Sequence, residues 1–299
     1  MFFHQKRLIN EIPSSDPDPA AANALQEGLG GQFGEMRTMM QYLFQSFNFR
    51  GDALQFKDLI QAVAIEEISH VELIATTISQ LLDGSPGYKP NGSATPGAGG
   101  ATPLAMAMST GNIHHYLVGA QGALPVDSAG NPWSGSYVYN SGNLPLDLLY
   151  NLMVEATGRL QKCRIYEMTD NPTARATISY LIVRDHAHQL TFARALEALG
   201  VDWGKLFPIP EFDASKYPEV KELMDKGLHL RQHHFRLDDS LLGELFVGPA
   251  ADGSGDLDLQ DEPPKGAPMP LSPERIEEFS PGLSDEMKKM MDELVGAPA

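Results

Sequence analysis

The chain has 299 residues, of which 42% are hydrophobic and 20% are charged, a composition typical of folded proteins and unlike that of disordered ones. Its 39 acidic residues outnumber its 22 basic residues and give a formal net charge of −17, so nucleic acid is not an expected partner. Cys163 is the single cysteine, which excludes an intrachain disulfide and a thiolate-rich metal cluster and favours a reducing compartment.

The N-terminal residues lack the basic segment and continuous apolar stretch of a secretory signal, so we expect a cytoplasmic protein. The longest apolar run, from Leu59 to Leu82, is interrupted by four ionisable residues, Glu66, Glu67, His70 and Glu72. A membrane span of about 20 residues does not tolerate so many ionisable groups. We therefore expect no membrane partner.

Four long segments have the pattern of helices, at about 19–49, 53–82, 145–170 and 172–200. Asp18 and Pro19 are typical of a helix start, and Asp83-Gly84 of a helix end. The short connections predict two antiparallel helical hairpins. A crossover at about 83–144, rich in Gly and Pro, joins them. This connectivity predicts an all-α, ferritin-like four-helix bundle over residues 1–200.

Residues 201–299 read as a C-terminal extension. We expect an extended segment at Leu206 to Pro210, one helix from about Pro218 to Leu228, and an acidic, Pro- and Gly-rich tail from about Pro249 to Pro273. The tail is too poor in apolar periodicity to build its own core, so we expect it to contact a neighbouring subunit of a homo-oligomer.

Each predicted hairpin carries the same pattern of acids and imidazoles. Glu35 in the first helix is followed by Glu67 and His70 in the second, and Glu155 in the third by Asp185 and His188 in the fourth. A carboxylate and an imidazole three residues apart lie on one helix face. Ferritin-like di-iron and di-manganese proteins use one Glu from each of two helices and a Glu-x-x-His from each of the other two.

A single Glu-x-x-His motif is usually a solvated helix face, roughly nine times in ten. Here the pattern recurs among apolar neighbours such as Met36 and Val63, where unpaired carboxylates would be costly unless a cation offsets their charge. The recurrence therefore favours a dinuclear metal site. Carboxylates with imidazoles suit manganese or iron, and the ligand types do not separate these two metals.

The sequence most resembles the manganese (non-haem) catalases, over most of its length and only loosely in the last 50 or so residues. The shared segments are FGEM at 33–36, Tyr42, QSFNFRG at 45–51, EEISHVEL at 66–73, SGNL at 141–144, RIYEMTDNP at 164–172 and LFPIP at 206–210. The resemblance implies a pair of manganese ions bound by Glu35, Glu67, His70, Glu155 and His188, with Glu67 bridging. It also implies hydrogen peroxide as substrate, a two-electron Mn(II,II)/Mn(III,III) cycle without haem, and a homohexamer. Calcium, present in some relatives, has no support in this sequence.

Three further residues are candidates for roles around the metals. Tyr42 follows Glu35, and Lys162 follows Glu155, by about two helical turns, which returns each to the face of its glutamate. The alternatives are a core-edge tyrosine and a snorkelling lysine. Family members carry Glu or no acid at the position of Asp185, so we expect Asp185 outside the ligand set, orienting a ligand or solvent. We favour Lys162 for channel or proton-handling work, with a pKa lowered by desolvation or metal charge.

Glu66 also lies within reach of His70, but only Glu67 reproduces the three-residue spacing of Asp185 and His188. We therefore expect Glu67→Ala to lose metal and Glu66→Ala to retain it. Weaker candidates are a surface cluster at His229, His233 and His234, the pair His114-His115, and Cys163 beside Lys162, which we interpret as an inert buried thiol.

Two other functions remain open on the sequence. A di-iron oxidase or oxygenase on the same bundle would consume dioxygen. A non-enzymatic metal-binding structural or coat protein would keep the fold, although the intact set of five ligands argues against it.

Overall fold

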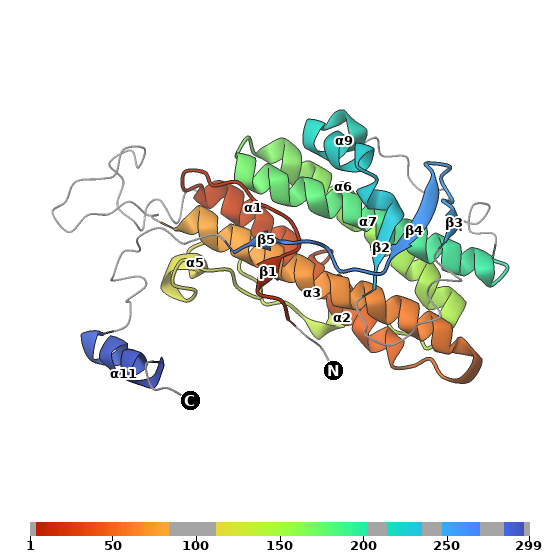
Figure 1. Ribbon diagram of the computed structural model, residues 1–299, viewed down its shortest axis with the longest axis horizontal. Coiled ribbons are helices and arrows are strands. Elements are labelled where there is room, and N and C mark those ends of the chain that lie inside the picture. The colour runs from red at the N-terminus through yellow and green to blue at the C-terminus, as the bar shows by residue number, and fades with distance from the viewer. Residues whose placement is uncertain (1–3, 84–111, 202–213, 235–246, 270–283, 296–299) are drawn as a thin grey trace.

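The structure is a computed structural model that describes residues 4–83, 112–201, 214–234, 247–269 and 284–295. Its centre is a bundle of four helices in two antiparallel hairpins (Figure 1), α2 (Glu35–Ser46) with α3 (Leu54–Leu82) and α6 (Leu144–Met168) with α7 (Pro172–Ala198). The two hairpins are joined by the long segment 83–143, as the ferritin-like connectivity requires. The predicted fold class is therefore confirmed.

The first predicted helix is wrong in one respect, because it breaks into α1 (Pro19–Gly30) and α2. Gly30 packs so closely on the backbone of Val126 that any side chain at residue 30 would collide with the Val126 carbonyl. At Gly34, a Cβ would lie 2.7 Å from the carbonyl oxygens of Gly28 and Leu29. The glycines thus allow the chain to turn sharply, and Glu35 becomes the first residue of α2 instead of a mid-helix residue.

The second hairpin begins and turns as its sequence predicts. The side chain of Asn143 accepts a hydrogen bond from Leu146 N at the start of α6, and the side chain of Asn171 accepts from Thr173 N and Ala174 N at the start of α7. Such caps satisfy backbone N–H groups that have no partner inside the helix. None of the helices in the described ranges is long and apolar enough to cross a membrane.

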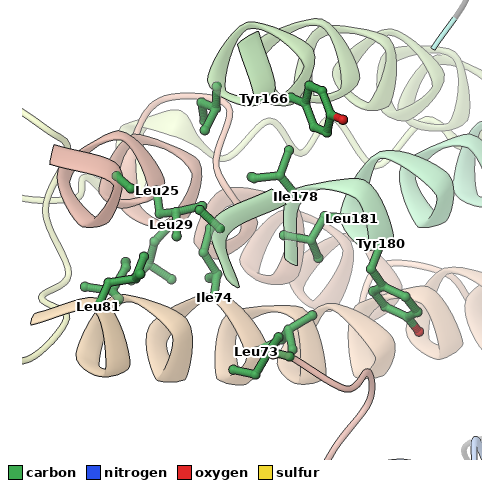
Figure 2. Close-up of a cluster of buried hydrophobic side chains, with 14 of the residues drawn as sticks. Leu25, Leu29, Leu73, Ile74, Leu81, Tyr166, Ile178, Tyr180 and Leu181 are labelled. Carbon is green, nitrogen blue, oxygen red and sulfur yellow. The ribbon is translucent and has the colours of Figure 1, made fainter. Parts of the chain in front are cut away.

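Two apolar clusters fill the bundle. One joins α1, α3, α6 and α7 and includes Leu25, Leu73, Tyr166 and Leu181 (Figure 2). The other lies toward the opposite end of the bundle, around Phe192, and its members include Tyr42, Leu59, Leu148, Leu152 and Leu196. A layer of buried charged side chains separates the two clusters, and this layer contains the candidate site.

The C-terminal extension packs on the bundle. Helix α9 (Pro218–Asp225) agrees with the predicted helix and contacts α7. A small sheet follows in the order β2-β4-β3, with β2 parallel and β3 antiparallel to β4 (Arg231–His233, Asp256–Gln260 and Gly248–Pro249). A second sheet pairs β1 (Arg7–Leu8) with β5 (Ala267–Pro268).

The predicted tail from Pro249 forms short strands, and Ala250, Leu257 and Ala267 in it are buried against the same chain. Its contact with a neighbouring subunit stays a prediction. Strands β1 and β2 escape prediction because their partners, β5 and β4, are distant in sequence. The segment 206–210 lies outside the described residues, and the division at residue 200 stays a prediction. The remaining elements are η1 (Gly51–Ala53), α5 (His114–Leu117), η2 (Gly135–Tyr137), η3 (Ala214–Lys216), η4 (Leu228–Leu230) and α11 (Asp285–Val295).

Candidate metal centre

Five ionisable side chains from four helices meet inside the bundle. They are Glu35 of α2, Glu67 and His70 of α3, Glu155 of α6 and His188 of α7, each no more than 1% exposed. Charged side chains are almost never buried to this extent unless they are paired or bind a metal. The fold brings together all five residues that the sequence singled out as ligands.

Glu67 lies between the two imidazoles. Its Oε2 is 3.1 Å from Nδ1 of His70, and its Oε1 is 2.9 Å from Nδ1 of His188. Glu35 Oε2 is 3.7 Å from Nδ1 of His70, and Glu155 Oε1 is 3.4 Å from Nδ1 of His188. Among the described residues, three groups of donor atoms lie within 4.8 Å of one another: two of them share Glu67, and the third joins Glu66 to His70 and His188.

The donor set fits metal ions of the manganese or iron type, because it combines carboxylates with imidazoles and contains no thiolate. Within the described residues, Glu35 Oε2, Glu67 Oε1 and both ring nitrogens of His188 form no hydrogen bond of ordinary geometry, although all are buried. An unsatisfied buried polar group costs about 1–3 kcal/mol. Cations bound between these atoms would offset that cost.

Burial and mutual charge perturb the pKa values of these groups. Burial raises the pKa of Glu155, and the nearby Glu67 adds to the effect against the opposing influence of His188. Burial acts the same way on Glu67, but His70 and His188 outweigh it and hold the pKa of Glu67 well below its usual range. Burial alone would lower the pKa of His70, yet Glu67 and Glu35 hold it well above normal. Perturbed groups of this kind cluster at functional sites.

Lys162 bridges two acids beside the site. Its Nζ lies 2.6 Å from Asp185 Oδ2 and 2.9 Å from Glu35 Oε1, and all three side chains are buried. Burial favours a lowered pKa for Lys162, but Asp185 and Glu35 outweigh it and raise the pKa. The direction expected from the sequence is therefore corrected. Asp185 belongs to neither of the two donor groups that share Glu67, and burial raises its pKa well above normal despite Lys162.

Tyr42 contacts the other end of the site. Its hydroxyl donates a hydrogen bond of 2.5 Å to Glu155 Oε1, and its ring packs edge-on against Phe192 at 5.1 Å between centroids. Burial, followed by the charge of Glu155, raises the pKa of Tyr42 well above normal. Tyr42 is thus a neutral donor that orients Glu155.

Sequence reasoning missed the partners of Glu66, which lie behind the imidazoles. Arg184 Nε donates to Glu66 Oε1 at 2.5 Å, Arg184 Nη2 donates to Glu66 Oε2 at 3.0 Å, and Gln232 Nε2 donates to Glu66 Oε2 at 3.1 Å. One signal was available, because Arg184 lies four residues before His188 and so shares its helix face. Gln232 carries no such signal, since only the tertiary fold brings β2 to this place.

The weaker candidates lie elsewhere. His229 is buried, in contrast to the expected surface cluster, and its ring stacks on His186, while His233 Nδ1 lies 2.8 Å from the carbonyl oxygen of Glu262. His234 Nε2 is 3.6 Å from Asp261 Oδ1. His115 is buried with its Nε2 2.9 Å from Gln26 Oε1, and His114 begins α5. None of them belongs to a group of metal-donor atoms found in the described part of the chain.

Cys163 is buried, and burial raises the pKa of its thiol to about 12. The thiol is therefore protonated at neutral pH, which agrees with the inert role expected from the sequence.

Comparisons with known proteins identify the family of the chain. The family model described as "Manganese containing catalase" matches residues 1–295. A protein of Bacillus subtilis named "Manganese catalase" is 42% identical over 208 residues, covering 70% of this chain and 74% of that protein. The uncharacterized protein YjqC of Bacillus subtilis (strain 168) is 41% identical over 263 residues, covering 86% and 88%.

Among solved structures, KatB, a manganese catalase from Anabaena, superposes with a TM-score of 0.56 at 24% identity, covering 81% of this chain and 94% of that chain. This likeness concerns the fold. Together with the match of the family model over nearly the whole chain, it leads to one conclusion: the chain belongs to the family of manganese-containing catalases, which are non-haem enzymes acting on hydrogen peroxide.

Proposed function

We propose that this protein disproportionates hydrogen peroxide to water and dioxygen at a pair of manganese ions. Glu35 and His70 would hold one ion, Glu155 and His188 the other, and Glu67 would bridge the two. The observation that carries the proposal is the placement of Glu67, whose two carboxylate oxygens each face a different imidazole within 3.1 Å.

When bound, manganese supplies reversible electron transfer between its divalent and trivalent states, so that one peroxide is oxidised to dioxygen and a second is reduced to water. The chain supplies positions and protons. Tyr42 orients Glu155 through its hydroxyl, and the helices fix both imidazoles in the dry interior. Preorganised groups in a water-excluded site need no rearrangement during the reaction.

The pair of Lys162 and Asp185 is suited to proton handling. Peroxide must lose protons to become dioxygen and must gain them to become water. Asp185 Oδ1 is buried without a hydrogen bond among the described residues, and Lys162 Nζ lies 2.6 Å from Asp185 Oδ2. A proton could therefore rest on Asp185 while Lys162 fixes its orientation, and general acid–base groups contribute about 10²- to 10⁴-fold to a rate.

The experiment that tests the proposal combines metal analysis with an oxygen electrode on the purified protein. We expect close to two manganese ions per chain, one dioxygen released per two peroxide consumed, and no Soret band. Iron as the main metal, with peroxide consumed and no dioxygen released, would favour a di-iron oxidase. Bound metal without peroxide turnover would indicate a structural or coat protein.

We also propose that the protein works as a cytoplasmic homohexamer that removes peroxide under oxidative stress. Large apolar side chains that are half exposed or more, including Phe47, Leu117 and Val118, support association into an oligomer. Sedimentation analysis at micromolar concentration should show a hexamer, and a monomer would contradict this part of the proposal.

A further inference from the structure

Glu66 lies on the side of the imidazoles that faces away from Glu67. Glu66 Oε1 is 3.4 Å from Nε2 of His70, and Glu66 Oε2 is 3.4 Å from Nε2 of His188. Neither contact has ordinary hydrogen-bond geometry in this structure, and no other group among the described residues hydrogen-bonds either Nε2. Each oxygen of this one carboxylate therefore faces one of the two rings.

Glu66 is itself held on its other side. Arg184 contacts both of its oxygens, and Gln232 donates to Oε2. Arg184 also donates through Nη1 to the carbonyl oxygens of Leu228 and Arg231, so the segment 228–232 of the C-terminal extension closes the cluster. The guanidinium already compensates the charge of Glu66, which leaves this carboxylate as a hydrogen-bond acceptor and makes it a poor ligand for a cation.

A neutral imidazole has one N–H donor and one nitrogen lone pair, and only the lone pair can bind a metal. An acceptor at Nε2 keeps the proton there and leaves the lone pair on Nδ1. In both rings it is Nδ1 that faces the carboxylates of the site. The partner of Nε2 thus decides whether each ring is ready to bind metal.

We infer that Glu66 is a positioning residue that holds both imidazoles with Nδ1 directed at the metal pair, and that Arg184 and Gln232 hold Glu66 in place. The inference rests on the proposed dinuclear site. It also revises the expectation, drawn from spacing alone, that Glu66 is dispensable for metal retention. The C-terminal segment then influences manganese affinity without contacting the metals.

The test is titration of the metal-free full-length chain with Mn²⁺, in which the EPR signal of unbound Mn²⁺ counts the ions that bind. Glu66→Gln keeps the size of the side chain but has a single acceptor oxygen, whereas the Nε2–H groups of His70 and His188 need one acceptor each. We expect it to keep one ion near wild-type affinity and to weaken the other by roughly 10- to 100-fold, the usual effect of losing an outer partner of a ligand. Glu66→Asp keeps both acceptor oxygens and should bind both ions better than Glu66→Gln.

Gln232→Leu is the second variant. It leaves the pair of Glu66 and Arg184 in place and removes the donor to Glu66 Oε2, together with the acceptor that Gln232 Oε1 offers to Arg184 Nη2 at 3.2 Å. We expect a smaller loss of affinity, about 3- to 10-fold. The matched control is Glu72→Gln, a substitution on the same helix at a partly exposed residue that pairs with His4, and it should bind like the wild type. Thermal unfolding of each metal-free variant identifies any that fail to fold.

Binding of both ions by Glu66→Gln at wild-type affinity would overturn the inference. If the pair of Glu66 and Arg184 were purely structural, Glu66→Gln would lower the unfolding temperature and leave the Mn²⁺ binding isotherm unchanged, and this result would overturn the inference too. Better binding by Glu66→Gln than by Glu66→Asp would indicate a packing role and overturn it as well. A wild type that binds two ions without releasing dioxygen refutes the proposed function alone. A wild type that binds no Mn²⁺ refutes both.

Discussion

The two helical hairpins carry the same spacing of acid and imidazole, yet the acid three residues before the histidine has different contacts in each. In α3, Glu67 reaches the centre of the site and faces both imidazoles. In α7, Asp185 occupies the equivalent position three residues before His188, but it turns to Lys162 at 2.6 Å. One methylene and one neighbouring lysine therefore separate an acid that faces both imidazoles from an acid that pairs with Lys162.

The hairpins also differ in charge. The imidazoles hold the pKa of Glu67 well below normal, whereas burial raises the pKa of both Glu155 and Asp185. The first hairpin thus presents an ionised acid between the rings, and the second keeps acids that retain protons more readily. The comparison shows that repeated spacing fixes where side chains lie, while their neighbours decide what they do.

The largest difference in manganese binding is expected between two variants in which Glu67 or Asp185 is replaced by its amide. Glu67→Gln removes the carboxylate that faces both rings, so manganese affinity should fall by more than the roughly 10- to 100-fold typical of an outer partner. Asp185→Asn should retain manganese. Metal analysis after gel filtration measures both variants, and equal loss of metal in the two would show that the hairpins are equivalent after all.

Lys162→Met tests the contact between Lys162 and Asp185, which has no counterpart at Glu67 in the first hairpin. The methionine keeps much of the length of the side chain but removes the charge between Asp185 and Glu35. We expect full manganese and a kcat lower by about 10²-fold, at the lower end of acid–base effects. If Lys162→Met and Asp185→Ala both keep manganese and near-native turnover, neither residue takes part in proton handling.

Removal of the metals should make stability depend on pH. Glu155 and Asp185 have raised pKa values in the folded chain, so they bind protons that the unfolded chain releases, and stability falls as the pH rises above about 4. His70 and His188 also have raised pKa values, and the stability they give below about 6.5 is lost as the pH rises through their folded values.

Both effects have the same sign. Four other histidines, His115, His186, His229 and His233, have lowered pKa values and act in the opposite direction only up to about pH 7. The unfolding temperature of the chelator-treated protein should therefore fall from about pH 7.5 to pH 9, and manganese-loaded protein should show a weaker trend because metal replaces the protons. Calorimetry on the two forms measures this, and a metal-free unfolding temperature that rises with pH over this range would contradict the assigned shifts.

A smaller effect is expected at Gly158, one turn from Glu155. A Cβ there would lie 3.2 Å from Asp185 Oδ2 and 3.5 Å from Lys162 Nζ. Gly158→Ala should displace this pair by a few tenths of an ångström and lower kcat about 3- to 10-fold with manganese unchanged. Gly28→Ala is the control, because its Cβ would meet only Ile74 and Ile165 side chains, and it should leave kcat unchanged.

The sequence was sufficient to predict the bundle and its five central side chains, because helical spacing is local and the pattern occurs twice. It was insufficient wherever a residue's role depends on a distant contact. The break before Glu35 depends on the approach of Val126 to Gly30, and the environment of Glu66 depends on Gln232 from β2. The pKa of Lys162 is a third case, since the two acids that raise it come from other helices.

The central claim is that both hairpins share one metal pair through Glu67. Anomalous diffraction at the manganese edge, from crystals of the manganese-loaded protein, tests it most directly. The account predicts two peaks per chain, one beside Glu35 and His70 and the other beside Glu155 and His188, with Glu67 in contact with both. A single peak, or a peak on the side of Glu66 and Arg184, would contradict it.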